Sequence, residues 1–266
     1  MQLNQTHILL TGATGGLGQS LACQLAEAGA MLLLAGRDAE RLSGLADYLG
    51  PGHGYVCADL TSREGVASVV DAAGEFGVDV LINNAGIGGF GLLKRQSWPT
   101  VEAILATNLD APIRLAHALL PELMARPQAA IVNIGSTFGS LPFPGFAAYS
   151  AAKAGLRGFS QALRRELADS HVAVIHIAPR AIDTPLNTEA VNALNRALNN
   201  RSDSAEVAAR QIVAALRRGD GERHLGFPER LFAWLNGVAP GLIDRGLAGK
   251  LAVIERHAPS RQSSSQ

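Results

Sequence analysis

The chain has 266 residues, of which 47% are hydrophobic and 17% charged, so it can bury a large core and is not typical of a disordered protein. Its 23 basic residues balance 23 acidic ones, which argues against nucleic-acid binding, because that function needs a net basic surface. Two cysteines are too few for a disulfide framework, and neither a signal peptide nor an apolar run of about 18 residues is seen, so we expect a cytoplasmic protein.

Short apolar segments alternate with longer amphipathic ones along most of the chain. The predicted strands are His7–Leu10, Met31–Ala35, Gly54–Ala58, Val80–Asn83, Ala129–Ile134 and Val172–Ala178. The predicted helices are Gly16–Ala28, Asp38–Leu49, Ser62–Phe76, Thr100–Ala125 and Ala147–Asp169. Strands that are apolar on both faces and alternate with helices are typical of a parallel sheet covered on both sides. We therefore predict an α/β fold with a doubly wound parallel sheet of the Rossmann type.

The last third of the chain continues this domain and then changes character. Three further elements are predicted, namely helices at Thr188–Asn200 and Ser204–Arg218 and a short strand at Arg223–Gly226. We expect a single domain over residues 1–226. An apolar helical extension, residues 227–258, is expected to pack on it. Residues 259–266 are polar and without periodicity, which predicts a disordered tail.

A glycine-rich loop follows the first predicted strand and precedes the first predicted helix. It covers residues 11–18 and reads TGATGGLG. Glycines in this place permit a tight turn and let the backbone approach a pyrophosphate, which then lies at the positively polarised start of the helix. A flexible turn is the alternative interpretation. The position of the loop between strand and helix favours nucleotide binding.

The end of the second predicted strand bears on which dinucleotide fits. Gly36 has no side chain, so no carboxylate at that position would repel a ribose 2′-phosphate. Arg37 offers a planar guanidinium that suits a phosphate, although it can also be a solvated surface arginine. We interpret Asp38 as the N-cap of the following helix. These residues favour NADP(H), with NAD(H) as the alternative.

Tyr149 and Lys153 lie four residues apart on a predicted helix and therefore share one of its faces. A phenol with a pKa of about 10 is a weak acid–base catalyst at neutral pH unless a cation stabilises its anion. We predict that Lys153 lowers the pKa of Tyr149 and that a bound nicotinamidium ring adds to this effect. An aromatic side chain packed near a surface lysine is the alternative.

Ser136 ends the fifth predicted strand. Ligands of open parallel sheets bind beyond the carboxyl ends of the strands, where a hydroxyl can hydrogen-bond a substrate carbonyl. A serine that merely caps a turn is the alternative. A serine hydrolase is disfavoured, because residues 135–139 lack the GxSxG spacing of a nucleophile elbow.

These motifs together resemble the classical short-chain dehydrogenase/reductase family over roughly residues 5–225. The resemblance is carried by Thr11, Gly12, Gly16, Gly18, Asp59, Asn83, Asn84, Ala85, Gly86, Asn108, Ser136, Tyr149, Lys153, Pro179 and Thr184. Ser136 precedes Tyr149 by 13 residues, which is the family's usual spacing. The glycine loop also fits the extended, epimerase-like branch, but the NNAG stretch at residues 83–86 and the short chain favour the classical one.

The resemblance implies an oxidoreductase that interconverts a carbonyl and an alcohol with a nicotinamide cofactor. It assigns proton transfer to Tyr149, a lowering of that pKa and a bond to the nicotinamide ribose to Lys153, orientation of the carbonyl to Ser136, and a proton-relaying water to Asn108. Together with Arg37, the cofactor contacts that we expect are Gly12, Thr14, Gly15, Gly16, Leu17, Gly18, Asp59, Leu60, Asn84, Ala85, Gly86, Tyr149, Lys153, Pro179, Ile182 and Thr184. We expect no metal site, because the seven histidines show no ligand spacing.

One position departs from the family's pattern. The family usually has Pro-Gly after the sixth strand, whereas this chain has Pro179-Arg180. Arg180 lacks the backbone freedom of glycine and is expected to place a guanidinium near the mouth of the site. The conformation of this loop and the polarity of the substrate pocket are therefore left open by the sequence.

Apolar residues cluster around the expected site and indicate a bulky apolar carbonyl or alcohol as substrate, with ordinary loop packing as the alternative. They are Phe90, Phe138, Leu141, Pro142, Phe143, Phe146 and Leu186. The C-terminal extension can be a lid, a subunit contact or a membrane-surface contact, and its thin basic face disfavours the last. The resemblance also implies a homodimer or homotetramer. A catalytically silent dinucleotide-binding regulator is the alternative function.

Overall fold

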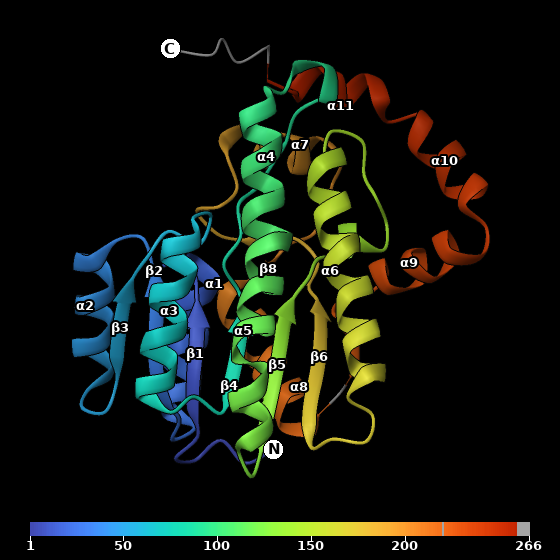
Figure 1. The fold of residues 1–266 in the computed structure, drawn as a ribbon. Helices are drawn as coiled ribbons and strands as arrows, with labels where there is room; N and C mark the ends of the chain where they lie inside the picture. The colour runs from blue at the N-terminus through green and yellow to red at the C-terminus, as the bar shows by residue number, and fades with distance from the viewer. Residues whose placement is uncertain (220, 260–266) are drawn as a thin grey trace.

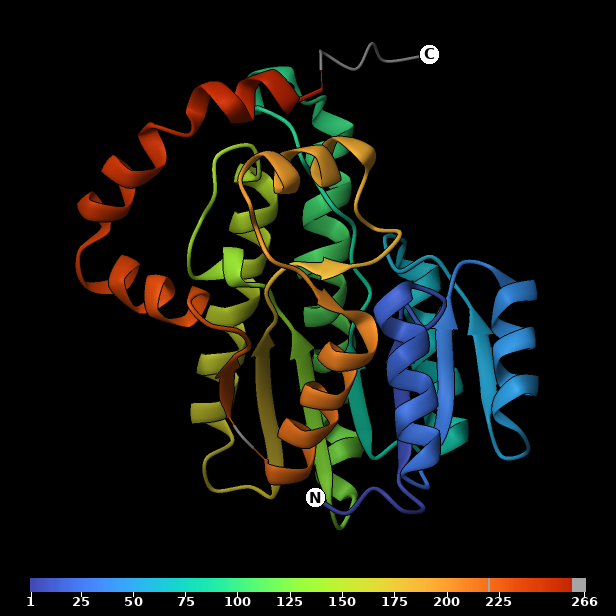
Figure 2. The same cartoon turned by 180° about the vertical axis from the view of Figure 1, so that it is seen from behind.

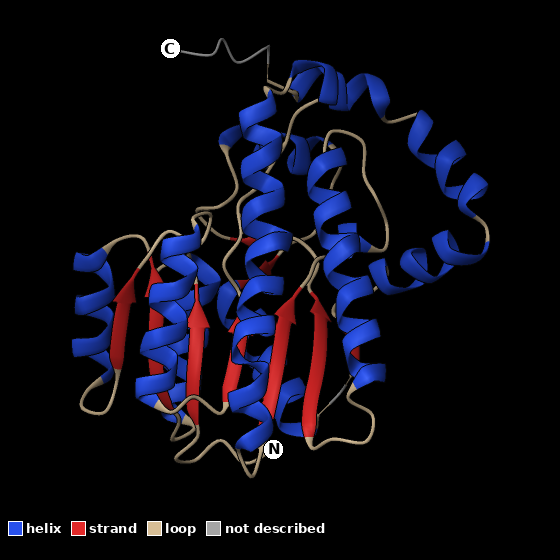
Figure 3. Ribbon diagram, in the orientation of Figure 1, coloured by secondary structure: helices blue, strands red, loops and turns tan. Residues whose placement is uncertain are grey.

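The continuous apolar segments of the sequence form the strands of a parallel sheet. A computed structural model describes residues 1–219 and 221–259 of the chain. Within these residues, seven parallel strands are arranged in the order β3-β2-β1-β4-β5-β6-β9 (Figure 3). Their bounds are β1 (His7–Thr11), β2 (Met31–Gly36), β3 (Gly54–Cys57), β4 (Val80–Asn83), β5 (Ala129–Ile134), β6 (Val172–Ala178) and β9 (Glu222–His224).

Helices cover both faces of this sheet, and Figures 1 and 2 show the two layers from opposite sides. They include α1 (Gly16–Glu27), α2 (Ala39–Leu49), α3 (Arg63–Phe76), α5 (Ala111–Ala125), α6 (Ala147–Glu166) and α8 (Ala205–Arg218). Successive side chains of a strand point to opposite faces. Ile8 and Leu10 thus pack in the core that contains α1, α2 and α8, while Leu9 packs in the core with α3, α5 and α6. The predicted doubly wound α/β fold is confirmed.

The predicted start of α2 is confirmed by its cap. Asp38 accepts a hydrogen bond from the backbone N–H of Arg41 at 3.0 Å. Ser62 caps α3 in the same way, accepting from the N–H of Gly65 at 2.9 Å. Each such cap contributes about 1 kcal/mol to stability.

The predicted helix Thr100–Ala125 is not one regular helix. It consists of α4 (Trp98–Leu105), a π-helical turn at Ala106–Asp110, and α5. Single π turns occur mostly inside α-helices at functional sites. This one contains the buried Asn108. Hydrophobic periodicity over five residues is too coarse to distinguish a π turn from an α turn, which is why the sequence does not predict it.

Two very short strands form a second sheet that the sequence does not predict. β7 (Ile182–Asp183) and β8 (Asp203–Ser204) pair in parallel and frame α7 (Glu189–Ala197). Two residues are too few to show a periodic pattern. The predicted strand at Arg223–Gly226 is instead β9, Glu222–His224. The left-handed φ of +95° at Gly226 is incompatible with an extended strand.

The C-terminal extension forms an arch, which we call the C-terminal arch and define as residues 227–258. It contains α9 (Glu229–Val238), α10 (Pro240–Ala248) and α11 (Leu251–His257). The arch leaves the domain beside β6 and returns above α4 and α7, beyond the carboxyl ends of the strands (Figures 1 and 2). Of the predicted tail, residues 260–266 lie outside the described residues. Among the described residues, we find no helix with the length and apolar character needed to cross a membrane.

Candidate active site

A cavity of about 1810 Å³ opens where the strands of the central sheet end. Its walls come from the loops after the strands, from the β7–β8 region and from the C-terminal arch. All of the predicted catalytic residues and all of the predicted cofactor residues line it. The topology explains this convergence, because the carboxyl ends of parallel strands meet at one edge of a sheet.

The glycine-rich loop lies in close contact with neighbouring backbone. Gly12 has a φ of +64°, and a Cβ atom there would lie 2.7 Å from the Cα of Ala85. A Cβ atom at Gly18 would lie 2.1 Å from the carbonyl oxygen of Gly12. Both positions therefore require glycine, so that the strand, the loop and α1 can pack together.

The start of α1 suits an anion. Gly15 is its N-cap and supplies no side-chain acceptor, and the first turn contains no acidic residue. The first backbone N–H groups of a helix carry partial positive charge and need acceptors. A phosphate can satisfy them, so the residues present fit a dinucleotide.

Thr11 joins the two loops that border this part of the cavity, a role that the sequence analysis missed. Its buried hydroxyl accepts hydrogen bonds from the backbone N–H groups of Asn84 and Ala85, both at 3.0 Å. The side-chain amide of Asn84 in turn donates to the carbonyl oxygens of Thr11 and Gly12, at 3.0 and 3.2 Å. The β1 loop and the β4 loop thus form one hydrogen-bonded unit. A threonine at the end of a strand, ahead of a glycine-rich loop, is the signal that could have indicated it.

Two arginines line the cavity near the end of β2. Arg37 is exposed there, as predicted. Arg41, which the sequence analysis did not single out, donates from its guanidinium to the carbonyl oxygen of Thr14 at 2.6 Å. Asp38 is the N-cap of α2, and one of its carboxylate oxygens accepts from the backbone N–H of Arg41. Because Gly36 has no side chain, this position places no carboxylate near the guanidinium groups of Arg37 and Arg41.

Asp59 follows β3 and lines the cavity beside Leu60, as predicted. One of its carboxylate oxygens accepts from the backbone N–H and the hydroxyl of Thr61, at 3.0 and 2.9 Å. The backbone hydrogen bond from Thr61 lowers the pKa of Asp59. The carboxylate is therefore charged at neutral pH and held in a fixed orientation.

Ser136, Tyr149 and Lys153 meet at the centre of the cavity. The hydroxyl of Ser136 accepts from the backbone N–H of Phe138 at 3.2 Å and lies close enough to the phenol of Tyr149 to lower its pKa. The ammonium of Lys153 lies over the Tyr149 ring, 5.9 Å from its centroid, and donates to the carbonyl oxygen of Ile134 at 2.9 Å. The end of β5 and the first turns of α6 thus bring together a hydroxyl, a phenol and an amine.

Burial dominates the electrostatics of this group. It raises the pKa of Tyr149 in the protein by itself, and the side chain of Ser136 opposes that rise. Burial also lowers the pKa of Lys153 to about 8. The prediction that Lys153, with a bound nicotinamidium ring adding to its effect, lowers the pKa of Tyr149 stays a prediction.

Asn108 is fully buried in the π-helical turn, and its amide group is engaged with backbone. The side-chain oxygen accepts from the N–H of Ile87 at 3.2 Å, and the side-chain nitrogen donates to the carbonyl oxygens of Ile87 and Ile104, each at 3.0 Å. The amide thereby holds the β4 loop against α4. The prediction that Asn108 holds a proton-relaying water stays a prediction.

Aromatic rings surround the phenol. Phe138 and Phe146 make edge contacts with Tyr149, at centroid distances of 6.4 and 6.3 Å. Phe143 stacks on Phe138 at 5.4 Å, and Phe90 stacks on Phe146 at 5.1 Å. These four phenylalanines line the cavity, as predicted.

Leu141 and Leu186 line the cavity as well, whereas the predicted Pro142 is exposed and is not among the lining residues. The C-terminal arch adds apolar lining that the sequence left among three alternatives. These residues are Phe227, Phe232, Leu235, Leu242, Ile243 and Leu247. One apolar chamber therefore extends from the phenol to the inner side of the arch.

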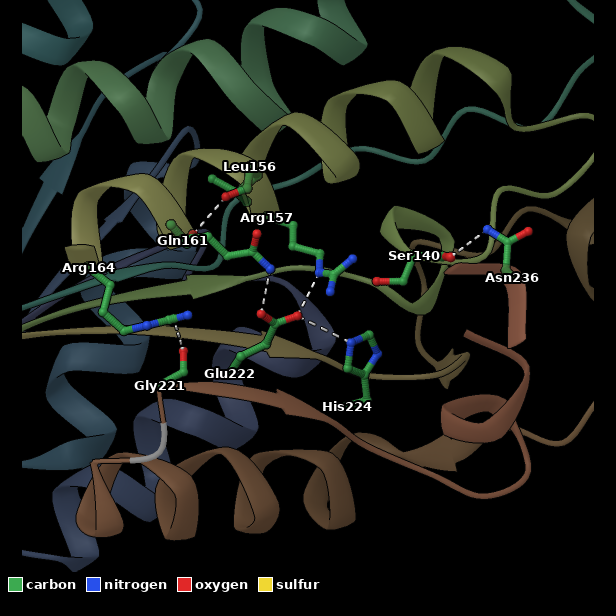
Figure 4. A network of polar contacts seen from close by, with 10 residues as sticks. Ser140, Leu156, Arg157, Gln161, Arg164, Gly221, Glu222, His224 and Asn236 are labelled. Atoms are coloured by element: carbon green, nitrogen blue, oxygen red, sulfur yellow. Dashed lines mark hydrogen bonds and ion pairs between the residues drawn. The ribbon is translucent and has the colours of Figure 1, made fainter. Parts of the chain in front are cut away.

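A polar network supports the sheet beside this chamber (Figure 4). Glu222 of β9 accepts from Arg157 at 2.6 Å and from Gln161 at 2.7 Å, both on α6. Burial opposes ionisation of Glu222, but these two hydrogen bonds prevail and lower its pKa to about 2. Nearby, the ring of the fully buried His176 lies against the backbone of Gly135. Burial lowers the pKa of His176 to about 4, so it is neutral at physiological pH. The sequence does not predict a role for Glu222 or for His176.

The loop after β6 lies across the cofactor side of the cavity. Thr184 is packed so closely on the start of α1 that a Cβ atom at Gly16 would lie 3.0 Å from its side chain. Pro179, Ile182 and Thr184 all line the cavity, as predicted. Arg180 is at the mouth, as expected, but its guanidinium is hydrogen-bonded to Asp203.

Comparison with known proteins agrees with this geometry. The family model described as short chain dehydrogenase matches residues 6–195. A 3-oxoacyl-[acyl-carrier-protein] reductase, FabG, from Vibrio cholerae is 36% identical over 222 residues, which cover 83% of this chain and 86% of that protein. Dehydrogenase/reductase SDR family member 7B from Bos taurus is 33% identical, and the match covers 91% of this chain and 80% of that protein. A solved short chain dehydrogenase from Burkholderia cenocepacia in complex with NADP has a TM-score of 0.80 at 28% identity, covering 93% of this chain and 99% of that one.

Proposed function

The chain belongs to the short-chain dehydrogenase/reductase family of oxidoreductases, and from this premise we propose that it is an active enzyme that interconverts a carbonyl and an alcohol with NADP(H). One observation carries the proposal: Ser136, Tyr149 and Lys153 line one cavity with the glycine-rich loop, and the amine of Lys153 lies over the phenol ring. A silent cofactor-binding regulator has no need of this arrangement.

The residues have complementary tasks in the proposed reduction. The cofactor, when bound, supplies the hydride. Ser136 donates a hydrogen bond to the carbonyl oxygen and so orients the substrate. Tyr149 transfers its phenolic proton to that oxygen as the negative charge develops there, and a general acid of this kind contributes about 10²–10⁴-fold to the rate. Lys153 is cationic at neutral pH and stabilises the phenolate that remains.

The same residues explain why the chain by itself leaves Tyr149 protonated. Burial favours the neutral phenol, which is the form that a general acid needs before the reaction. The positive charge of Lys153 stabilises the phenolate relative to the phenol, so in the proposed reaction it opposes the effect of burial on the pKa of Tyr149. In the oxidative direction, Tyr149 would act as the base, and the positive charge of an oxidised nicotinamide ring would favour that role.

The corner at the end of β2 supports NADP(H) as the cofactor. Arg37 is exposed at this corner, and Arg41 donates to the carbonyl oxygen of Thr14 in the glycine-rich loop. Guanidinium groups bind phosphate oxygens in a planar, often bidentate manner. The similar structure from Burkholderia cenocepacia is in complex with NADP. NAD(H) is the alternative.

The lining of the cavity supports a carbonyl or alcohol that carries a bulky apolar group. Phe138 and Phe146 flank Tyr149, and the inner residues of the C-terminal arch continue the apolar surface. We therefore assign the arch the role of a lid over the substrate, in preference to a membrane contact. The similarity to a 3-oxoacyl-[acyl-carrier-protein] reductase is consistent with a ketone on an aliphatic chain. A homodimer or homotetramer is also proposed, to be tested by light scattering.

The experiment is an NADPH-oxidation screen against ketones and aldehydes of graded size, with Tyr149→Phe as the matched variant. We expect turnover that increases with the apolar size of the carbonyl. Tyr149→Phe should lose about 10²-fold or more in kcat and still bind NADPH, because it removes the hydroxyl that supplies the proton and leaves the ring in place. Binding is measured separately by the fluorescence of NADPH. Equal rates for the variant and the unmodified protein would refute the proposed function.

A further inference from the structure

Arg180 joins three segments that are far apart in the sequence. Its Nε donates to Asp203 Oδ2 at 2.9 Å, and a second guanidinium nitrogen donates to Asp203 Oδ1. A third contact joins Nη1 to Glu229 Oε2 at 3.8 Å. Arg180 follows β6, Asp203 begins β8, and Glu229 is the first residue of α9. The three side chains are only 17%, 14% and 24% exposed, so these ion pairs are largely shielded from solvent.

The stem of Arg180 packs at the point where the C-terminal arch leaves the domain. A Cβ atom at Gly226 would lie 2.8 Å from Cδ of Arg180 and 3.2 Å from Oε2 of Glu229. Gly226 also has a φ of +95°. The chain therefore turns into the arch directly against the arginine stem, while the head of the same arginine contacts the first residue of α9. Arg180 therefore contacts the base of the C-terminal arch through both its aliphatic stem and its guanidinium.

The remainder of the arch is held near the end of α9 and at α11, but not along α10. Asn236, near the end of α9, donates to the carbonyl oxygen of Ser140 at 3.0 Å (Figure 4). In α11, Ile254 is fully buried, and Arg95 donates to the carbonyl oxygens of Glu255 and Ala258. α10 has no buried residue. The position of α10 over the cavity therefore depends on the contacts at the two ends of the arch.

The charge of Arg180 is matched by two carboxylates, which bears on what the cavity can bind. A guanidinium with a bidentate aspartate and a nearby glutamate has no unmatched charge to offer an anionic group of a substrate. Arg180 lies at the mouth of the cavity, but its paired charge does not make the substrate chamber a site for anionic groups. The geometry favours a structural task for this guanidinium at the arch.

We propose that Arg180 is a positioning residue for substrate specificity: it locks the base of the C-terminal arch to the β7–β8 sheet and so sets the apolar wall of the substrate chamber. It contacts none of the reacting groups. The kinetic part of this inference rests on the proposed function. Its consequence is that loss of Arg180 weakens binding of bulky apolar carbonyls much more than it slows the transfer of hydride.

The test compares Arg180→Leu, Glu229→Gln and Arg196→Leu. Arg180→Leu removes the whole cluster, and Glu229→Gln removes only the contact to the arch while the Asp203 pair stays intact. Arg196→Leu is the matched control, because its ion pair with Glu189 on α7 is exposed and should matter little. Each variant is assayed with one bulky apolar carbonyl and one small aldehyde, and hydrogen exchange of residues 229–238 is measured without any substrate.

We expect Arg180→Leu to raise KM for the bulky carbonyl roughly tenfold, which corresponds to about 1.4 kcal/mol, and to change kcat with the small aldehyde less than about threefold. Glu229→Gln should raise the same KM by a smaller factor. Both should accelerate exchange in α9 and leave exchange in α6 unchanged, while Arg196→Leu should change exchange in neither helix.

Two outcomes would overturn the inference. In one, exchange of α9 in Arg180→Leu and Glu229→Gln equals that of Arg196→Leu. In the other, Arg180→Leu impairs only carbonyls that carry a carboxylate, which would make the guanidinium a direct substrate contact. If no carbonyl is turned over, the proposed function fails, but the exchange measurement still decides whether Arg180 holds the arch.

Discussion

The cofactor side and the substrate side of the cavity are built by different means. On the cofactor side, backbone contacts set the geometry, as at Gly12 and Gly18 and in the hydrogen bonds between Thr11 and the β4 loop. On the substrate side, two-residue strands, ion pairs of Arg180 and a long arch set it. Backbone packing tolerates almost no change, whereas side-chain contacts can be exchanged one at a time. The difference predicts that a substitution in the backbone contacts of the cofactor side disturbs the cavity more than a substitution in the side-chain contacts of the substrate side.

The largest effect of a substitution is expected at Gly18, on the cofactor side of the cavity. Gly18→Ala places a Cβ atom 2.1 Å from the carbonyl oxygen of Gly12, so the loop must move away from α1. We expect NADPH binding to be lost and stability to fall by about 1–3 kcal/mol, as is typical of overpacking. Isothermal titration calorimetry and thermal unfolding measure the two effects.

Gly44→Ala is the control for this substitution. Gly44 lies in α2 with no atom near its missing Cβ, so the same added methyl should stabilise the protein by about 0.5–1 kcal/mol and leave NADPH binding unchanged. Unchanged cofactor affinity in Gly18→Ala would contradict the claim that backbone contacts set the cofactor side.

A smaller effect is expected at Arg37 and Arg41, because these two residues contribute side chains, not backbone contacts, to the cofactor side of the cavity. Arg37→Leu and Arg41→Leu should each reduce the preference for NADPH over NADH, and each lost charge-assisted contact is worth about 1.5–3 kcal/mol. Arg41→Leu should have the additional effect of loosening the loop at Thr14, to which it donates a hydrogen bond. Specificity constants for the two cofactors measure the preference. Equal use of NADPH and NADH by the unmodified protein would show that this corner does not select a phosphate.

The sequence was sufficient for the regular, backbone-determined part of the molecule. Continuous apolar strands and glycine spacing predicted the parallel sheet and the loop at residues 11–18, because burial on both faces and close backbone contact each demand particular residue types. Asp38 was predicted as a helix cap for the same reason, since its side chain acts within three residues of its own position.

The other features of the fold and of the site depend on contacts between residues that are distant in the sequence, and no local pattern reveals such contacts. The Arg180–Asp203–Glu229 cluster joins segments separated by more than twenty residues, and β7 and β8 are too short to show a period. The π turn around Asn108 is stabilised by bonds to Ile87 rather than by its own composition. The burial that raises the pKa of Tyr149 could not be predicted either, because four-residue spacing shows that two side chains are near each other, not how much solvent surrounds them.

The central claim is that burial raises the pKa of Tyr149 and that positive charge placed beside its hydroxyl lowers it. The direct measurement is a spectroscopic titration of tyrosinate, taken as the difference between the unmodified protein and Tyr149→Phe, with and without oxidised cofactor. We predict a pKa above the ordinary value of about 10 in the protein alone and a clearly lower value with NADP⁺ bound, with the decrease reduced in Lys153→Met. A pKa that is already low in the protein alone, or that is indifferent to both the cofactor and Lys153, would contradict the account.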